Sequence, residues 1–378
     1  MPYALAGMRA LGASPKTNGL TIMYPEDSEV KGFRTGHQMN FSRLFIPAHD
    51  IASLVWRGDT LVDWVRGGAV FHLDGKCQEA RVAWGHPFDA ACATPDGWFA
   101  VVYERVGTKA LLLRDGRILR ELNRSYYQAK AYEYPICIWR NADHRTLIAH
   151  CPEEYCRIDI EDAESGACLT VGKRKPQDFF HSRLMVNTAR TRLLSAGWVW
   201  HPLDSIMYFD IIEALRNPEH LDRADNTAPG SFHVGLAEHA SACWQSNERA
   251  LLGASSEEED PTEVAEPNAS ALRLRPRGIA VYDVVSHSYI KSVVLDEVAG
   301  TMMPLGERYA VCFYKHPRVV SLDSGETVLR WDDLDTGSQV SSIIWDKKHP
   351  PLALDSENRR FAVAGADGIT VIQIDMAR

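Results

Sequence analysis

Length, composition and charge narrow the classes of protein that this chain can be. It has 378 residues, 45% hydrophobic and 24% charged, which is typical of a globular protein with one large all-β domain or two ordinary domains. Its formal net charge of -9 at pH 7 disfavours a nucleic-acid partner, because the protein would repel phosphate groups. No apolar run approaches the roughly 20 residues of a membrane helix and no basic segment opens the chain. We therefore expect a cytoplasmic protein without a membrane partner.

The predicted elements, in chain order, are one isolated strand and seven units of strands. GLTIMY, residues 19–24, is predicted as the isolated strand. The units follow at 51–84, 86–128, 131–172, 179–232, 233–296, 299–334 and 338–378. Each is predicted to supply three strands and often a fourth, such as GRILREL or YIKSVVL. In the third unit ACLTVG, residues 167–172, takes the fourth place, and in the last unit VSSIIW, residues 340–345, is the predicted first strand.

These units are recognised by a repeated pattern. In residues 187–211, NTARTRLLSAGWVWHPLDSIMYFDI, a polar turn precedes a short apolar run, and a loop leads to a second run. The runs have the length of strands, and β-branched and aromatic residues are frequent in them. The residue after each turn marks the repeat, at spacings of about 40 to 60 residues. The seven markers are Thr60, Phe99, Thr146, Leu193, Ala250, Tyr309 and Phe361.

Seven repeats of about four short strands predict an all-β fold, a seven-bladed β-propeller of four-stranded antiparallel blades. One blade cannot bury both its faces alone, whereas a closed ring of blades buries them against each other. The last unit lacks a fourth strand, so the N-terminal strand at 19–24 is predicted to supply it and close the ring. Residues 1–378 then form a single domain.

The pattern resembles that of WD40-like and YVTN-type propellers. In HASACWQSNERALLGAS followed by GIAVYDV, Tyr282 and Asp283 occupy the place of the Trp-Asp pair of WD40 repeats. The chain departs from that pattern in most units: its one literal Trp-Asp pair, Trp331-Asp332, ends an outer strand. The resemblance therefore implies the ring of blades rather than the hydrogen-bonded motif of true WD40 repeats.

Two units carry insertions. Asp210 is predicted to cap a short helix that ends before Asn217-Pro218. Residues 255–276 are acidic, interrupted by proline and poor in large apolar side chains, so we expect a mobile loop. Two interpretations of this acidic loop remain open, a solvated insertion and a docking segment for a basic partner.

The candidate site is a set of polar residues at matched positions before the innermost strands. No GxSxG, HExxH, P-loop or glycine-rich dinucleotide motif occurs in the sequence, and no cofactor is expected. In a propeller, the segments that lead into the innermost strands meet on one face around the central channel. Twelve or thirteen residues before four consecutive markers stand His86, Glu133, His181 and Glu238, and their neighbours are Asp89, Tyr134, Arg183 and His239.

Two functions compete for this face. The first is non-enzymatic binding of a protein partner, which these eight residues would contact and for which an exposed Trp198 and Trp200 pair would be an anchor. The acidic residues of this face favour a partner with a basic surface. An inhibitor or immunity protein of a bacterial toxin is a narrower form of this hypothesis, by analogy. The alternative is a metal-dependent hydrolase resembling lactonase-like propellers, with His86, Glu133, His181 and Glu238 as ligands.

Overall fold

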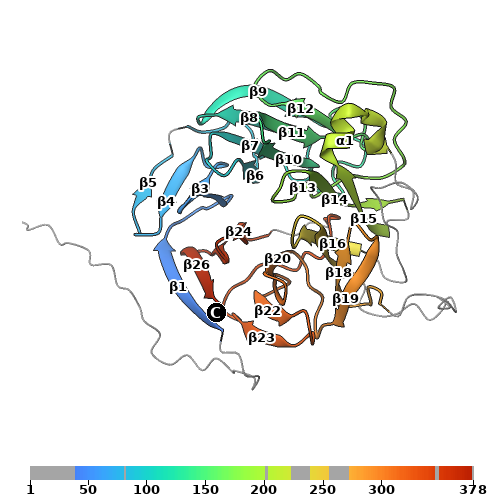
Figure 1. The fold of residues 1–378 in the computed structure, drawn as a ribbon. Helices are drawn as coiled ribbons and strands as arrows, with labels where there is room; N and C mark the ends of the chain where they lie inside the picture. The colour runs from blue at the N-terminus through green and yellow to red at the C-terminus, as the bar shows by residue number, and fades with distance from the viewer. Residues whose placement is uncertain are drawn as a thin grey trace, which may run out of the picture.

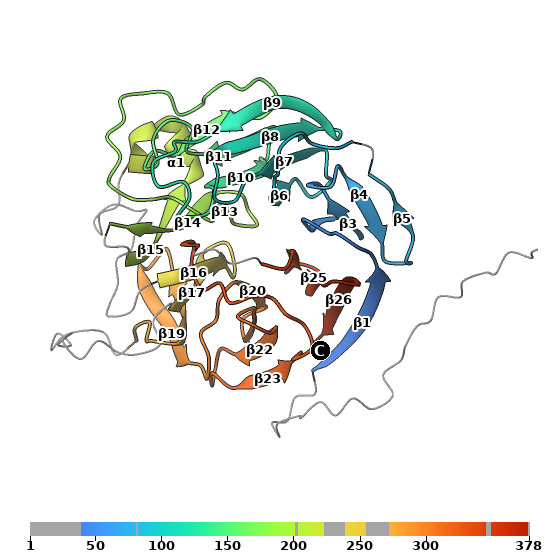
Figure 2. The ribbon, with the colours of Figure 1, turned by 180° about the vertical axis from the view of Figure 1, so that it is seen from behind.

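The computed structural model describes residues 39–80, 82–200, 203–222, 239–254, 272–344 and 349–376. Within these ranges the chain forms seven antiparallel sheets that follow one another around a common centre, as Figure 1 shows from one face and Figure 2 from the other. The predicted strand at 19–24, Glu238 and residues 255–271 of the predicted acidic loop lie outside the described residues. No helix in the described part of the chain is both long enough and apolar enough to cross a membrane.

Five of the sheets are blades of four strands. Blade 1 contains β2 (Val55–Arg57), β3 (Thr60–Asp63), β4 (Ala69–His72) and β5 (Cys77–Gln78), and blade 2 contains β6 (Ala90–Ala93), β7 (Phe99–Tyr103), β8 (Lys109–Arg114) and β9 (Arg117–Asn123). Blade 5 contains β16 (His239–Trp244), β17 (Arg249–Ala254), β18 (Gly278–Asp283) and β19 (Ser288–Val294), and blade 6 contains β20 (Met302–Leu305), β21 (Tyr309–Cys312), β22 (Arg318–Ser321) and β23 (Thr327–Arg330). Blade 7 contains β24 (Leu352–Asp355), β25 (Arg360–Ala364), β26 (Gly368–Asp375) and β1 (Asn40–Pro47).

The other two blades have three paired strands each within the described residues. Blade 3 contains β10 (Ile136–Arg140), β11 (Thr146–His150) and β12 (Asp159–Asp162), and blade 4 contains β13 (Met185–Val186), β14 (Arg192–Val199) and β15 (Leu203–Asp210). In blade 3 the segment predicted as a fourth strand makes one isolated bridge, between Glu161 and Cys168. In blade 4 the chain continues from β15 into α1 (Ile211–Arg216) and the 3₁₀ helix η1 (Pro218–Asp222). Asp210 accepts a hydrogen bond from the backbone N–H of Glu213, which confirms the predicted helix cap.

An N-terminal strand closes the ring, as predicted, but this strand is β1. It pairs antiparallel with β26 along its whole length, from Asn40 opposite Asp375 to Pro47 opposite Gly368. The sequence pattern predicts residues 19–24 for this position. The first strand of the same blade also differs from the prediction, because it is β24 and not residues 340–345, of which Ile343 makes an isolated bridge with Tyr132.

The hydrophobic core lies between the blades. Seven clusters of buried apolar side chains each join two consecutive blades, including one that joins blade 7 to blade 1 through Ile46, Leu61 and Val371. The cluster between blades 4 and 5 contains Leu274, which is fully buried although sequence analysis placed it in the acidic loop. Because each blade depends on two neighbours for its core, the ring is one cooperative body.

The first strand of each blade lies nearest the centre. First strands of consecutive blades contact one another, β2 with β6, β6 with β10, β10 with β13, β13 with β16, β16 with β20 and β24 with β2. Since the strands of a blade alternate in direction, the linkers between blades and the loops joining second to third strands emerge together. We call this side of the ring the linker face. The turns joining first to second strands and third to fourth strands lie on the opposite face.

Closure by β1 predicts a contrast between two positions on that strand. Replacing Ile46, which is fully buried between blades 7 and 1, by alanine should lower the free energy of unfolding by about 2 to 5 kcal/mol through lost burial and a new cavity. Replacing the exposed Ser42 by alanine should change it by less than about 0.5 kcal/mol. Urea unfolding measures both values. Equal small effects would show that β1 does not complete the ring.

Candidate functional site

Six of the eight residues of the predicted site lie in linkers of the linker face. His86 and Asp89 precede β6, Glu133 and Tyr134 precede β10, and His181 and Arg183 precede β13. The eighth residue, His239, begins β16, and only its backbone is described. The chemistry of these residues depends on the partner that each side chain has.

Glu133 is held by an ion pair with Arg183. Its carboxylate lies 3.0 Å from the Arg183 guanidinium, and both side chains are largely buried. Burial alone would raise the pKa of Glu133, but the positive charges of Arg183 and Arg105 outweigh burial and hold the pKa below its ordinary value. The backbone carbonyl of Glu133 accepts a hydrogen bond from the Ser182 hydroxyl at 2.8 Å. This acid therefore joins two linkers and is not a free charge at the rim.

His181 is a core residue. Its side chain is almost fully buried, and its Nδ1 lies 3.1 Å from the hydroxyl of Ser195. Burial lowers the pKa of His181 to about 3, so the ring is neutral near pH 7. Its position beneath the linker face suits packing against Phe179 better than contact with a ligand.

The remaining predicted residues are also engaged within the chain. The imidazole of His86 lies 3.3 Å from the carboxylate of Glu104, in the second-to-third-strand loop of the same blade. Asp89 accepts a hydrogen bond of 2.6 Å from the backbone N–H of Arg105. Tyr134 is buried, with the guanidinium of Arg124 over its ring. In the part of the chain that the structure describes, no group of three or more His, Cys, Asp or Glu side chains could hold a metal ion.

A segment between blades 6 and 7 crosses the ring on this face. Residues 336–344, which we call the strap, start from blade 6, where the N–H of Thr336 donates to the carbonyl of Lys315. They then reach the linker between blades 2 and 3, on the other side of the ring. There Ile344 N–H donates to the Ala131 carbonyl at 2.8 Å, and Glu133 N–H donates to the Ser342 carbonyl at 3.0 Å. The strap thus covers the middle of the linker face beside Glu133.

Next to the strap, five aromatic rings from blades 3 and 4 and their linkers form a stack that we call the aromatic platform: Tyr127, Tyr155, Phe180, Trp198 and Trp200. Phe180 is sandwiched between Trp198, at a centroid distance of 3.8 Å, and Tyr155, at 4.3 Å. Tyr127 lies 6.0 Å from Phe180, and Trp200 lies 6.2 Å from it. In the four pairs that include Phe180 the ring planes are inclined by 28° or less, whereas Tyr127 and Tyr155 are inclined by 37° to each other.

The platform is buried at its base and exposed at two of its rings. Phe180 and Trp198 are almost fully buried together with Tyr132, and Ile343 of the strap packs against them. Trp200 is 49% exposed and Tyr127 is 48% exposed. The prediction of an exposed Trp198 and Trp200 pair is thus confirmed for Trp200 and wrong for Trp198. Tyr127, Tyr155 and Phe180 were missed, although each lies in a linker or a second-to-third-strand loop, where side chains meet on one face.

Two acidic residues next to Tyr155 have no ion pair with any described residue: Asp178, which contacts its hydroxyl, and Glu154, which precedes it in sequence. The exposed Asp178 accepts a hydrogen bond of 2.8 Å from the hydroxyl of Tyr155. Glu154, also exposed, directly precedes Tyr155. Neither acid forms an ion pair with another described residue, whereas Glu153 in the same loop pairs with Arg157. Among the described residues of this loop and the following linker, Asp178 and Glu154 therefore carry negative charge that no ion pair offsets.

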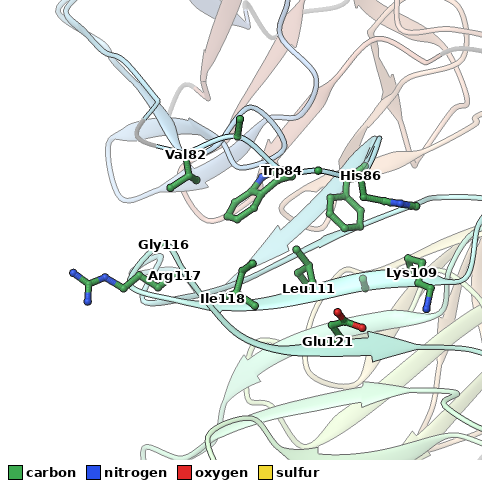
Figure 3. Close-up of a pocket in the computed structure, with 13 residues that line it drawn as sticks. Val82, Trp84, His86, Lys109, Leu111, Gly116, Arg117, Ile118 and Glu121 are labelled. Atoms are coloured by element: carbon green, nitrogen blue, oxygen red, sulfur yellow. The ribbon is translucent and has the colours of Figure 1, made fainter.

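A separate groove of about 680 Å³ lies between blades 1 and 2. Figure 3 shows Val82, Trp84 and His86 on one wall and Leu111 and Ile118 on the other. β5, the outermost strand of blade 1, has only two residues, and the segment that follows it lines the groove. Val82 and Ile118 are exposed there, but the rings of the aromatic platform do not line it.

Comparison with known proteins supports the fold of this chain and does not assign a function to it. No protein-family model matches the chain, and no curated protein matches its sequence. A chain in the crystal structure of the mitotic checkpoint complex matches with a TM-score of 0.56 at 12% identity, over 96% of this chain and 99% of that one. Hydrazine synthase of Kuenenia stuttgartiensis matches with a TM-score of 0.52 at 12% identity, over 85% of this chain and 95% of that one. The chain thus has a WD40-like seven-bladed β-propeller fold, which confirms the resemblance at the level of fold.

The burial of His181 predicts a pH-dependent stability. Between its ordinary pKa of 6.5 and about 3, the unfolded chain binds a proton that the folded chain does not, so stability should fall as pH falls below 6.5. Replacing His181 by glutamine should make this decline shallower by up to about 1.4 kcal/mol per pH unit. Urea unfolding at pH 7.5 and pH 5 measures the slope. The exposed His49, replaced by glutamine, serves as a control that should keep the wild-type slope; an unchanged slope for His181→Gln would contradict the account.

Proposed function

We propose that this protein is a non-enzymatic interaction module and that it binds a partner protein through the aromatic platform on its linker face. The observation that carries the proposal is the pair of half-exposed rings, Trp200 and Tyr127, fixed over a buried stack. Tryptophan and tyrosine dominate binding energy at protein interfaces, and exposed apolar patches on a folded chain mark sites of association.

The surroundings of the platform keep it in one conformation. Arg124 is buried beneath the linker that carries Tyr127, and its guanidinium donates to the carbonyls of Ala129 at 2.6 Å and Tyr132 at 2.9 Å. Phe180 pairs with Trp198 through two backbone hydrogen bonds, of 2.8 and 3.1 Å. A surface whose loops are already ordered loses little entropy on binding. This rigidity favours recognition of a specific partner.

The alternative of a metal-dependent hydrolase receives no such support. Of its four predicted ligands, Glu133 is neutralised by Arg183, His181 is buried against Ser195, His86 faces Glu104, and Glu238 lies outside the described residues. Rearranging them into a metal site would leave Arg183 without its counter-ion in a largely buried position, which is costly.

The fold itself is compatible with assembly, since the matched chain of the mitotic checkpoint complex is, by that name, part of a complex. The narrower hypothesis of a toxin inhibitor or immunity protein stays a prediction, because no described residue bears on the identity of the partner. The eight rim residues of the sequence analysis are now proposed as supports of the binding face, with the platform as its contact surface.

The test is a comparison of captured proteins between variants of a purified bait. Replacing Tyr127 and Trp200 together by alanine should reduce capture of a partner about tenfold or more, because each is expected to contribute at least about 1 kcal/mol. Trp98→Ala is the matched control, since Trp98 is 47% exposed in a turn on the opposite face. Mass spectrometry of the retained proteins and the thermal midpoint of each bait are measured together.

The expected pattern is one or more proteins retained by the wild type and by Trp98→Ala and lost from the double variant, with all three baits folded. If the double variant retains the same proteins in the same amounts, the aromatic platform is not the binding surface. Loss of the same proteins from Trp98→Ala alone would place the interface on the opposite face.

A further inference from the structure

We propose that the aromatic platform takes an arginine side chain of the partner, whose guanidinium stacks on the exposed rings and pairs with Asp178. This inference rests on the proposed function, because it names the chemistry that the same surface recognises. It depends on three features of the described residues: the stacking of the rings, the absence of an ion pair at Asp178 and Glu154, and an arginine that the chain itself already stacks.

The rings of the platform suit a flat cation. Tyr127 is inclined by 18° to Phe180, and Trp200 is inclined by 28° to the same ring. Each half-exposed ring is thus stacked, at a moderate angle, against Phe180, which is almost fully buried. A guanidinium is planar and stacks on aromatic faces, and the attraction between a cation and a ring is greatest for tryptophan.

The carboxylate of Asp178 lies at the hydroxyl of Tyr155, one of the rings of the platform. One oxygen of Asp178 accepts the hydroxyl hydrogen of Tyr155, which holds the side chain at the edge of the platform. Among the described residues Asp178 has no cationic partner, and neither does Glu154. Two exposed acids next to an apolar stack favour a positively charged ligand, and a planar fork of N–H donors matches a carboxylate in two hydrogen bonds.

The chain stacks arginine on the same aromatic cluster internally. The guanidinium of Arg124 lies 4.5 Å from the ring centre of Tyr132, which packs edge-on against Phe180. In blade 7, Arg360 lies 4.1 Å from the ring centre of Trp56 and pairs with Asp355. The arrangement proposed for the partner, an arginine between an aromatic ring and an aspartate, thus already occurs within this chain.

Arginine rather than lysine follows from the geometry. A lysine ammonium is a compact, strongly hydrated charge that gains less from flat rings, whereas a guanidinium can lie parallel to Trp200 while its edge faces a carboxylate. Citrulline has the shape of arginine without the charge, so it separates stacking from charge.

The test uses three blocked heptapeptides, Gly-Ser-Gly-Arg-Gly-Ser-Gly and its counterparts with lysine or citrulline at the centre, titrated into the full-length protein by calorimetry at low salt. The arginine peptide should bind with a dissociation constant of roughly 1 mM, the lysine peptide about fivefold more weakly and the citrulline peptide at least about tenfold more weakly. Trp200→Ala and Asp178→Asn should each weaken binding of the arginine peptide about fivefold or more.

Two control variants show whether an effect on peptide binding is specific to the aromatic platform. Trp98→Ala and Asp143→Asn change an exposed tryptophan and an exposed aspartate in turns of the opposite face, and both should bind the arginine peptide as the wild type does. Absence of binding at about 10 mM, equal binding of the lysine or citrulline peptide, or unchanged binding by Trp200→Ala or Asp178→Asn would overturn the inference. If capture of a protein still depends on Tyr127 and Trp200 while the arginine peptide does not bind, the proposed function stands and this inference alone fails.

Discussion

Burial of apolar side chains between consecutive blades is the interaction on which the rest of the structure depends. A blade of three or four short strands has two faces to cover, and each face finds its cover only in a neighbouring blade. The chain must therefore close on itself, and it does so where β1 pairs with β26 and Ile46 enters the core between blades 7 and 1. A break at this point would uncover two faces at once.

A closed ring also determines what the linkers can do. Their ends are anchored in strands. Across the linker face, Glu133 pairs with Arg183, and Arg124 donates a hydrogen bond to the backbone carbonyl of Tyr132. The strap, between blades 6 and 7, forms backbone hydrogen bonds with the linker that precedes blade 3. The polar groups at the centre are thus used to hold the face together. The half-exposed aromatic rings and the acids beside them are not used in this way, which is why the aromatic platform, and not the ring of polar residues, is proposed as the contact surface.

Sequence patterns predict the second and third strands of the blades well, because the turn and the two apolar runs are local features. They do not show which β-prone segment pairs with β26, since residues 19–24 and Asn40–Pro47 both have strand character and only pairing across the whole chain decides between them. The pairing of Glu133 with Arg183 joins linkers that are 50 residues apart, so the sequence cannot reveal that this acid is already neutralised. The sequence indicates Trp200 but not the rings that stack with it, because Tyr127, Tyr155 and Phe180 come from three other segments of the chain.

The central claim, that a rigid linker face carries the binding surface, is tested most directly by hydrogen exchange of the protein alone and in complex with a captured partner. The account predicts slower exchange in the complex within residues 124–134, 150–158 and 177–183, which carry or support the aromatic platform. It predicts no change in the turn at 94–98 on the opposite face. Protection confined to that opposite face, or to the groove between blades 1 and 2, would contradict it.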